Sequence, residues 1–179
     1  MRDPVAVMSM PDPMAKWTPV PDWRTVSLMR DGWSLKPVPG LGRTIVIGRI
    51  AEAIASIAPD CPMLGLWEIA QTPAFAIRMS RDKAMIVSPE PLGLTPGWNA
   101  GGWAVTPADS GYLAFELAGD ELDAIIREAT TTDVWAGSRS AAIVFAGVAC
   151  LMVRTAPKTA LLHVETGRDA YIWRWLETR

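Results

Sequence analysis

Hydrophobic positions in the last forty residues, 140–179, follow two different periods. Three apolar runs at 141–145, 148–153 and 160–164 are rich in valine, leucine and isoleucine and predict β-strands. Ala146-Gly147 between the first two runs predicts a hairpin turn. Thr166, with Asp169 three residues later, resembles a capping box, so we expect a closing helix that ends Tyr171-Ile172-Trp173-Arg174-Trp175-Leu176.

A second strand and helix precede this segment. Residues 111–117 alternate, with Leu113, Phe115 and Leu117 on one face, which predicts a half-buried strand. The next stretch, 120–129, has apolar residues at helical spacing and an acidic first turn of Asp120, Glu121 and Asp123. Because carboxylates are favoured at the positive end of a helix, we interpret these three as capping residues and not as a catalytic acid–base set.

The middle of the chain predicts further short elements. We expect strands at 25–29, 43–47, 64–69, 74–79 and 83–87, a helix at 50–57, and a loop at 89–102, where proline and glycine accumulate. Strands and helices do not alternate regularly, which favours an α+β fold over a parallel α/β fold. The sequence therefore predicts one α+β domain over residues 25–179, with an antiparallel sheet and few helices.

The first 24 residues have a different composition. Five of them are proline and four are methionine, and proline at this density interrupts both helices and sheet ladders. Trp17 and Trp23 favour an extended arm with buried anchors, which lies across its own domain or across a partner.

Composition limits the classes of function. Half of the residues are hydrophobic and 20% are charged, as in a globular protein. The net charge of −2 gives no general attraction to nucleic acid or to an anionic membrane. The apolar run 141–153 has 13 residues, against the roughly 20 that a membrane-spanning helix needs. Since no apolar signal segment precedes Pro11 and Pro13, we expect a cytoplasmic protein.

Few residues are suited to chemistry. His163 is the single histidine and lies on the strand face opposite Leu162 and Val164, where we expect a structural or surface role. Gly40-Leu41-Gly42-Arg43 precedes a strand and not a helix, so it is interpreted as a turn and not as a phosphate loop. Cys61 and Cys150 are predicted to be free thiols, although the sequence leaves a disulfide open. We therefore predict no catalytic or metal-ligating residues in this chain.

Two residue types are candidates for binding. Arginine is a natural ligand for a carboxylate, such as the glutamate tail of a folate, and the candidates are Arg78, Arg81, Arg127, Arg139, Arg154 and Arg168. Tryptophan is the other, with nine in the chain. Trp173 and Trp175 lie roughly 200° apart around the closing helix, so both cannot face the same neighbour. We take Trp17, Trp23, Trp173 and Trp175 as interface candidates.

The order of elements over residues 104–176 resembles the gamma subunit of heterotetrameric sarcosine oxidase. The residues that support this resemblance are Phe115-Glu116-Leu117-Ala118-Gly119, the helix at 121–129, the strand pair within 143–153, and Tyr171 to Leu176. The same order is similar to the folate-binding domain of the aminomethyltransferases. The chain contains no K-G-C-x-x-G-Q stretch of the folate-linked iron–sulfur repair relatives, and no second half that would complete an aminomethyltransferase.

The resemblance implies a non-catalytic subunit that packs against larger flavoprotein subunits. Such complexes demethylate N-methyl amino acids such as sarcosine, with FAD, FMN and NAD in the partner subunits. Tetrahydrofolate, the one-carbon acceptor, would lie at a subunit interface. The alternative is a free-standing aminomethyltransferase-like domain that binds folate by itself.

Overall fold

Two six-stranded β-sheets form the centre of the molecule in the computed structural model, which describes residues 19–179. Sheet A contains, in spatial order, β1 (Leu28–Arg30), β2 (Trp33–Val38), β9 (Tyr112–Gly119), β12 (Thr159–Glu165), β11 (Val148–Ala156) and β10 (Ala142–Phe145). Sheet B contains β4 (Met63–Leu64), β5 (Phe75–Arg78), β6 (Lys83–Ser88), β3 (Gly42–Gly48), β8 (Trp103–Pro107) and β7 (Gly97–Asn99). Neighbouring strands are antiparallel except for β4 and β5.

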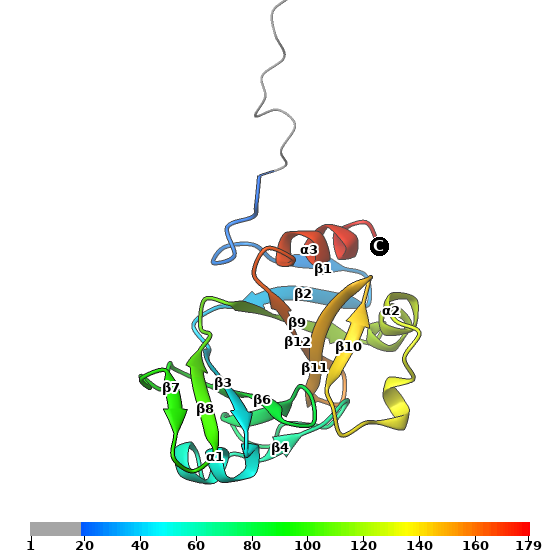
Figure 1. Cartoon of the computed structure of the whole chain (residues 1–179). Coiled ribbons are helices and arrows are strands. Elements are labelled where there is room, and N and C mark those ends of the chain that lie inside the picture. The colour runs from blue at the N-terminus through cyan, green and yellow to red at the C-terminus, as the bar shows by residue number, and fades with distance from the viewer. Residues whose placement is uncertain (1–18) are drawn as a thin grey trace, which may run out of the picture.

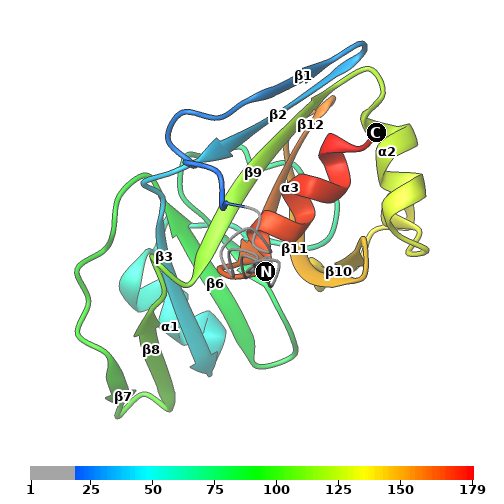
Figure 2. The same ribbon diagram turned by 90° about the horizontal axis from the view of Figure 1, so that it is seen from above.

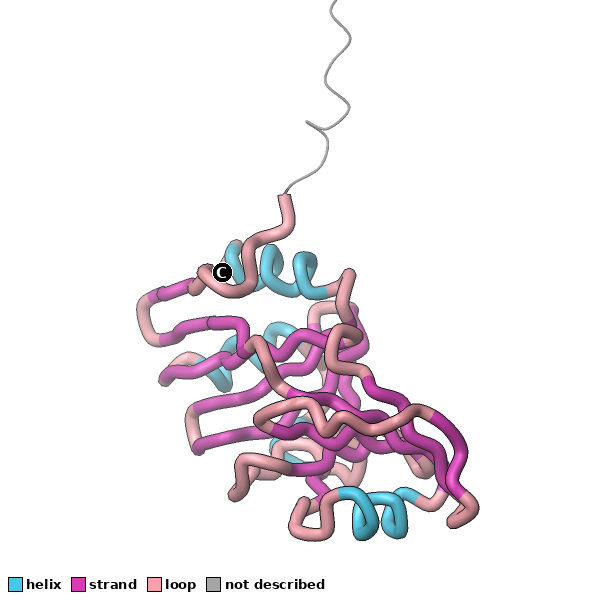
Figure 3. The backbone as a smooth tube through the Cα atoms, turned by 90° about the vertical axis from the view of Figure 1, so that its left-hand side faces the viewer, coloured by secondary structure: helices cyan, strands magenta, loops and turns pink. Residues whose placement is uncertain are grey.

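The helices lie outside the two sheets. α1 (Ile50–Ile57) contacts β3, β6 and β8 of sheet B, whereas α2 (Leu122–Ala129) and α3 (Asp169–Glu177) contribute to the core that covers the outer face of sheet A. A short 3₁₀ helix, η2 (Val134–Ala136), follows α2. Figure 1 shows α3 above sheet A and α1 below sheet B, and Figure 3 shows the sheets stacked between these two helices. The expected α+β class is confirmed.

The number of sheets differs from the expectation of one. The inner face of sheet A supplies Leu151, Val153 and Leu161 to a core shared with sheet B. Its outer face supplies Phe115, Met152 and Leu162 to a core shared with α2 and α3. Residues 150–153 and 160–164 therefore bury apolar side chains on both faces of sheet A. A sequence pattern cannot distinguish a sheet between two cores from a single fully buried sheet.

Strand β2 was not anticipated, because Pro37 and Pro39 favour a loop. Pro37 nevertheless pairs with Phe115 of β9. The hydrogen-bonding edge of Trp33 and Leu35 faces β1, and that strand begins at Leu28, opposite Leu35. The nitrogen of Pro37 therefore points to a side where β1 has already ended, and no ladder hydrogen bond is lost.

Two further expectations were wrong in their extent. The strand expected at 64–69 is reduced to Met63–Leu64, because the backbone turns at Trp67 with φ of 65°. The loop expected at 89–102 contains β7, which pairs with β8 through Gly97 to Asn99. The hairpin at Ala146-Gly147 is confirmed: both residues have positive φ (49° and 81°), as a two-residue type I′ turn requires.

Asp123 lies in the first turn of α2 as expected, but the predicted side-chain capping hydrogen bonds are wrong. Glu121 precedes α2 but makes no capping hydrogen bond, and Asp120 instead pairs with Lys158. At α3 the Thr166 hydroxyl donates to the carbonyl of Ser110 at 2.7 Å. Asp169 accepts hydrogen bonds from the backbone N–H groups of Gly167 and Ala170, at 3.1 and 2.9 Å. A single carboxylate therefore stabilises the start of α3.

Candidate functional site

The closing helix α3 lies across the outer face of sheet A, as Figure 2 shows from above. Its buried side chains are Ile172, Trp173 and Leu176, at the spacing of one helical face. Tyr171 lies on the opposite side and is 52% exposed. The helix therefore presents one face to its own core and the other to solvent.

Trp173 lies in an aromatic cluster with Trp23 and Phe115. Its ring centroid is 5.7 Å from that of Trp23 and 6.2 Å from that of Phe115, and the Trp23–Phe115 contact is edge-to-face at 5.5 Å. Trp173 is only 5% exposed, whereas Trp23 is half-buried. Edge-to-face aromatic pairs contribute roughly 0.5–1.5 kcal/mol beyond the area they bury. The cluster therefore fixes the segment around Trp23 on the folded domain.

Trp175 points to a different neighbour. Its ring lies edge-to-face on Phe145 of β10 at 5.7 Å, and the Arg179 guanidinium lies 3.9 Å above the indole centroid. Arg179 also pairs with Glu128 of α2. The half-buried indole of Trp175 thus lies between the end of β10 and the carboxy terminus.

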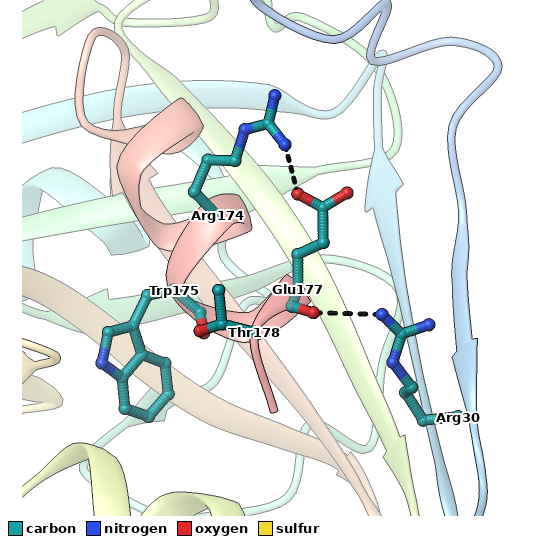
Figure 4. Close-up of polar contacts among 5 residues, drawn as sticks. All are labelled: Arg30, Arg174, Trp175, Glu177 and Thr178. Carbon is teal, nitrogen blue, oxygen red and sulfur yellow. Dashed lines mark hydrogen bonds and ion pairs between the residues drawn. The ribbon is translucent and has the colours of Figure 1, made fainter. Parts of the chain in front are cut away.

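Polar contacts hold the end of α3 against β1 (Figure 4). Arg30 donates to the carbonyl of Glu177 at 3.0 Å, and Arg174 pairs with the Glu177 carboxylate at 2.5 Å. The Thr178 hydroxyl donates to the carbonyl of Trp175 at 2.8 Å. These groups are exposed, so each contributes little to stability on its own, but they fix which side of the helix end faces outward.

The structure therefore places three of the four interface candidates in or against α3, on different sides of it. Trp23, Trp173 and Trp175 all lie at α3, while Trp17 lies outside the described residues. Each of the three contacts its own chain, and Trp23 and Trp175 keep part of the indole at the surface. Their role in an interface stays a prediction.

The interior between the sheets contains an arginine and the histidine. Arg43 is 3% exposed and His163 is fully buried. Arg43 donates through Nη1 to the carbonyls of Leu41 and Asp109, and its backbone N–H donates to the Asp109 carboxylate at 2.7 Å. Within the described chain, Nε and Nη2 of Arg43 and both ring nitrogens of His163 have no hydrogen-bond partner.

Burial and the neighbouring charge determine the ionisation of this pair. Desolvation, with a contribution from Arg43, lowers the pKa of His163 to about 3. Desolvation also lowers the pKa of Arg43, against the opposing effect of Asp109. His163 is therefore neutral at physiological pH. Of the two roles expected for it, structural or surface, the structure shows a buried position.

A cleft of about 240 Å³ opens at one end of the space between the sheets. Its walls are mainly apolar and include Met79, Ala142 and Leu151, and Lys83 and Glu165 are its charged lining residues. Tyr112 donates a hydrogen bond of 3.3 Å to Glu165, and desolvation together with this carboxylate raises the pKa of Tyr112. The cleft has the size and the apolar walls to take one side chain or a small molecule.

Sequence reasoning missed a row of four side chains in which two contacting tryptophans are flanked by two arginines. The Arg154 guanidinium lies 4.9 Å from the Trp67 ring, Trp67 contacts Trp135 at 5.9 Å, and Arg127 lies 4.0 Å above Trp135. Arg154 also donates to the carbonyl of Trp67 at 2.9 Å. These residues are distant in sequence and share no motif, so only the fold brings them together. Two of the six arginines considered for folate are thus engaged with indoles.

The two cysteines are free and buried, as predicted. Desolvation raises the pKa of the Cys61 thiol to about 11 and that of Cys150 to about 12. Neither is therefore a reactive thiolate at neutral pH. Within residues 19–179 no three histidine, cysteine or acidic side chains converge as metal ligands. The same part of the chain contains no helix that is long and apolar enough to cross a membrane.

Comparison with known proteins places the fold. The sequence matches no protein-family model and no curated protein. The structure is similar to a chain of the heterotetrameric sarcosine oxidase from Corynebacterium sp. U-96, solved in complex with pyrrole 2-carboxylate, with a TM-score of 0.63. The similarity covers 82% of both chains, at 13% sequence identity. The protein therefore has a sarcosine oxidase-related α+β fold.

Proposed function

We propose that this protein is a non-catalytic, gamma-like subunit of a heteromeric flavin-dependent oxidoreductase that demethylates N-methyl amino acids such as sarcosine. One observation carries the proposal: the fold corresponds, over 82% of both chains, to a chain of a heterotetrameric sarcosine oxidase. In this proposal FAD, FMN and NAD are bound by the partner subunits.

The surface at α3 supports the assignment of a partner-facing side. Trp23 and Trp175 each leave part of an indole at the surface, and Tyr171, four residues before Trp175 on α3, is 52% exposed. Large aromatic side chains that already have a fixed rotamer lose little entropy when a partner covers them, which makes them suitable interface anchors. The proposal places the larger subunit against this side of sheet A.

Co-expression with the flavoproteins encoded by neighbouring genes tests the function. We expect the protein to co-elute in size exclusion with a flavin-containing subunit, which is detected by its flavin absorbance. The ratio of the two proteins should be constant across the peak. A chain that stays monomeric and captures no flavoprotein would contradict the proposal. Trp175→Ala should weaken the complex, whereas Trp98→Ala, at an exposed tryptophan on β7 (72% exposed), should not.

Tetrahydrofolate is proposed as a ligand of the subunit interface and not of the isolated chain. Titration of the purified protein with tetrahydrofolate should give weak or no binding, and titration of the assembled complex should give saturable binding. Tight binding by the isolated chain would instead favour the alternative, a free-standing aminomethyltransferase-like folate-binding domain.

A further inference from the structure

The cleft between the sheets is lined by two residues of opposite charge that are not paired with each other. Lys83 begins β6 of sheet B and Glu165 ends β12 of sheet A, so the two side chains reach the cleft from different sheets. In the part of the chain that the structure describes, Lys83 forms no ion pair, and the Glu165 carboxylate accepts a hydrogen bond only from Tyr112. The cleft therefore offers one cation and one anion to a molecule that enters it.

Each of the two charges is suited to contact a ligand. Lys83 is half-buried, so its ammonium is less hydrated than one at an open surface and attracts a carboxylate more strongly. Glu165 is exposed, but the Tyr112 hydroxyl donates to its Oε1 at 3.3 Å, which restrains the carboxylate. Oε2 of Glu165 is left to accept from a further N–H donor.

The rest of the cleft is mainly apolar. Ala142, Ala149 and Leu151 line it from sheet A, and Met79, the residue after β5, lines it from sheet B. The two alanines are small and occupy little of the space, while Leu151 is 4% exposed and belongs to the core between the sheets. A short apolar group of a ligand would therefore bury its surface against these four side chains.

Size and charge together define the class of ligand. The volume of about 240 Å³ is below the roughly 300–1,000 Å³ of pockets for drug-sized molecules, so the ligand must be small. A ligand that contacts both charges needs a carboxylate and an ammonium a few ångströms apart, together with a short apolar group. A free α-amino acid combines these features. A simple carboxylic acid or amine has only one of the charges, and the two charged termini of a peptide are separated by its length.

We propose that the cleft binds a free amino acid with a short apolar side chain, whose carboxylate contacts Lys83 and whose ammonium contacts Glu165. The apolar side chain packs against Met79, Ala142 and Leu151. The proposal does not rest on the function assigned above, because the residues that form this site all belong to the one chain.

An NMR titration of the full-length protein with three related compounds tests the class of ligand. The backbone amides of Ala142, Ala149 and Leu151 should shift saturably with L-valine. Isovalerate lacks the amino group of valine and isobutylamine lacks its carboxylate, so each should bind about tenfold more weakly or worse, since each forfeits one hydrogen bond to a charged group. Equal affinity for the three compounds would overturn the proposal, because only the apolar walls would then bind.

Two variants test the assignment of the charges. Lys83→Met should weaken valine binding by about tenfold or more without weakening the binding of isobutylamine. Glu165→Gln, which keeps an acceptor for Tyr112, should weaken valine binding without weakening that of isovalerate. Lys158→Met is the matched control, because Lys158 pairs with Asp120 outside the cleft, and it should change none of the affinities. Unchanged valine affinity in either cleft variant would contradict the assignment.

Ala142→Trp tests the location of the site. Ala142 is exposed on β10, so a larger side chain there enters the cleft and not the core, and both charges are kept. Valine binding should be lost while the midpoint of thermal unfolding stays unchanged. Valine affinity equal to that of the wild type would overturn the proposal, because the amino acid would then bind elsewhere on the surface.

Discussion

His163 lies in the space between the sheets with the guanidinium of Arg43 as its charged neighbour. Charging the imidazole would add a second positive charge to a site where burial already disfavours one. The chain therefore keeps a neutral histidine. His163 lies two residues along β12 from Glu165, which pairs with Tyr112 at the cleft.

This environment predicts an acid-sensitive contribution to stability. The pKa of His163 is about 3 in the folded protein and near 6.5 in the unfolded chain, so the unfolded state binds the extra proton between these values. The contribution is fully present above pH 6.5 and is lost as the pH falls toward 3, with a slope of up to about 1.4 kcal/mol per pH unit. Urea unfolding between pH 4 and 7 should show a shallower pH dependence in His163→Leu than in the wild type; equal slopes would contradict this account.

Ala146 is a second residue whose environment has a measurable consequence. Its φ of 49° is unfavourable for any residue with a Cβ atom, whereas Gly147 beside it takes φ of 81° without strain. Ala146→Gly should therefore raise the free energy of unfolding by about 0.5–1 kcal/mol in thermal or chemical unfolding. The matched control is Ala149→Gly, at an exposed position of β11, which should lower stability by about 0.5–1 kcal/mol. Destabilisation of equal size in both variants would show that the turn is not strained.

At the scale of elements, the two tryptophans of α3 have different tasks. Trp173 is buried against Trp23 and Phe115, so Trp173→Ala should cost roughly 3–5 kcal/mol of unfolding free energy. Trp175 lies against Phe145 with part of its ring at the surface, and Trp175→Ala should cost about 1–2 kcal/mol. Chemical denaturation of the isolated protein measures both. A larger loss for Trp175 would mean that the core of the domain lies at the β10 end of the helix.

The elements also show where sequence reasoning succeeded. The helix at 50–57 was predicted with its observed bounds and the turn at Ala146-Gly147 at its observed position, because helical spacing and a Gly-containing turn are local properties. The strand at Pro37 was missed, since whether a proline is tolerated depends on which neighbour faces its nitrogen. The arginine–tryptophan row was missed for the same kind of reason: its four members come from β11, the turn at Trp67, η2 and α2.

At the scale of the whole molecule, sheet A connects two cores. Val153 and Leu161 bury against sheet B, and the alternate residues Met152 and Leu162 bury against the helices. Because sheet A contributes to both cores, loss of packing in one core disrupts the sheet on which the other packs. We therefore expect one cooperative unfolding transition. Far-UV circular dichroism, near-UV circular dichroism and tryptophan fluorescence should give the same midpoint. Separate midpoints would show that the sheets are independent units and would contradict a single domain over 25–179.

The sequence by itself determined the α+β class, the positions of most strands, the closing helix, and the placement of Trp173 and Trp175 on different sides of it. These properties follow from the period of side chains along one element. Only the tertiary structure decided that the strands form two sheets, that His163 and Arg43 meet between them, and that Lys83 and Glu165 line one apolar cleft. Each of these depends on which residues from distant parts of the chain come into contact. Because both faces of sheet A are buried, its strands have apolar residues at successive positions, and the sequence pattern does not show which face contacts which neighbour.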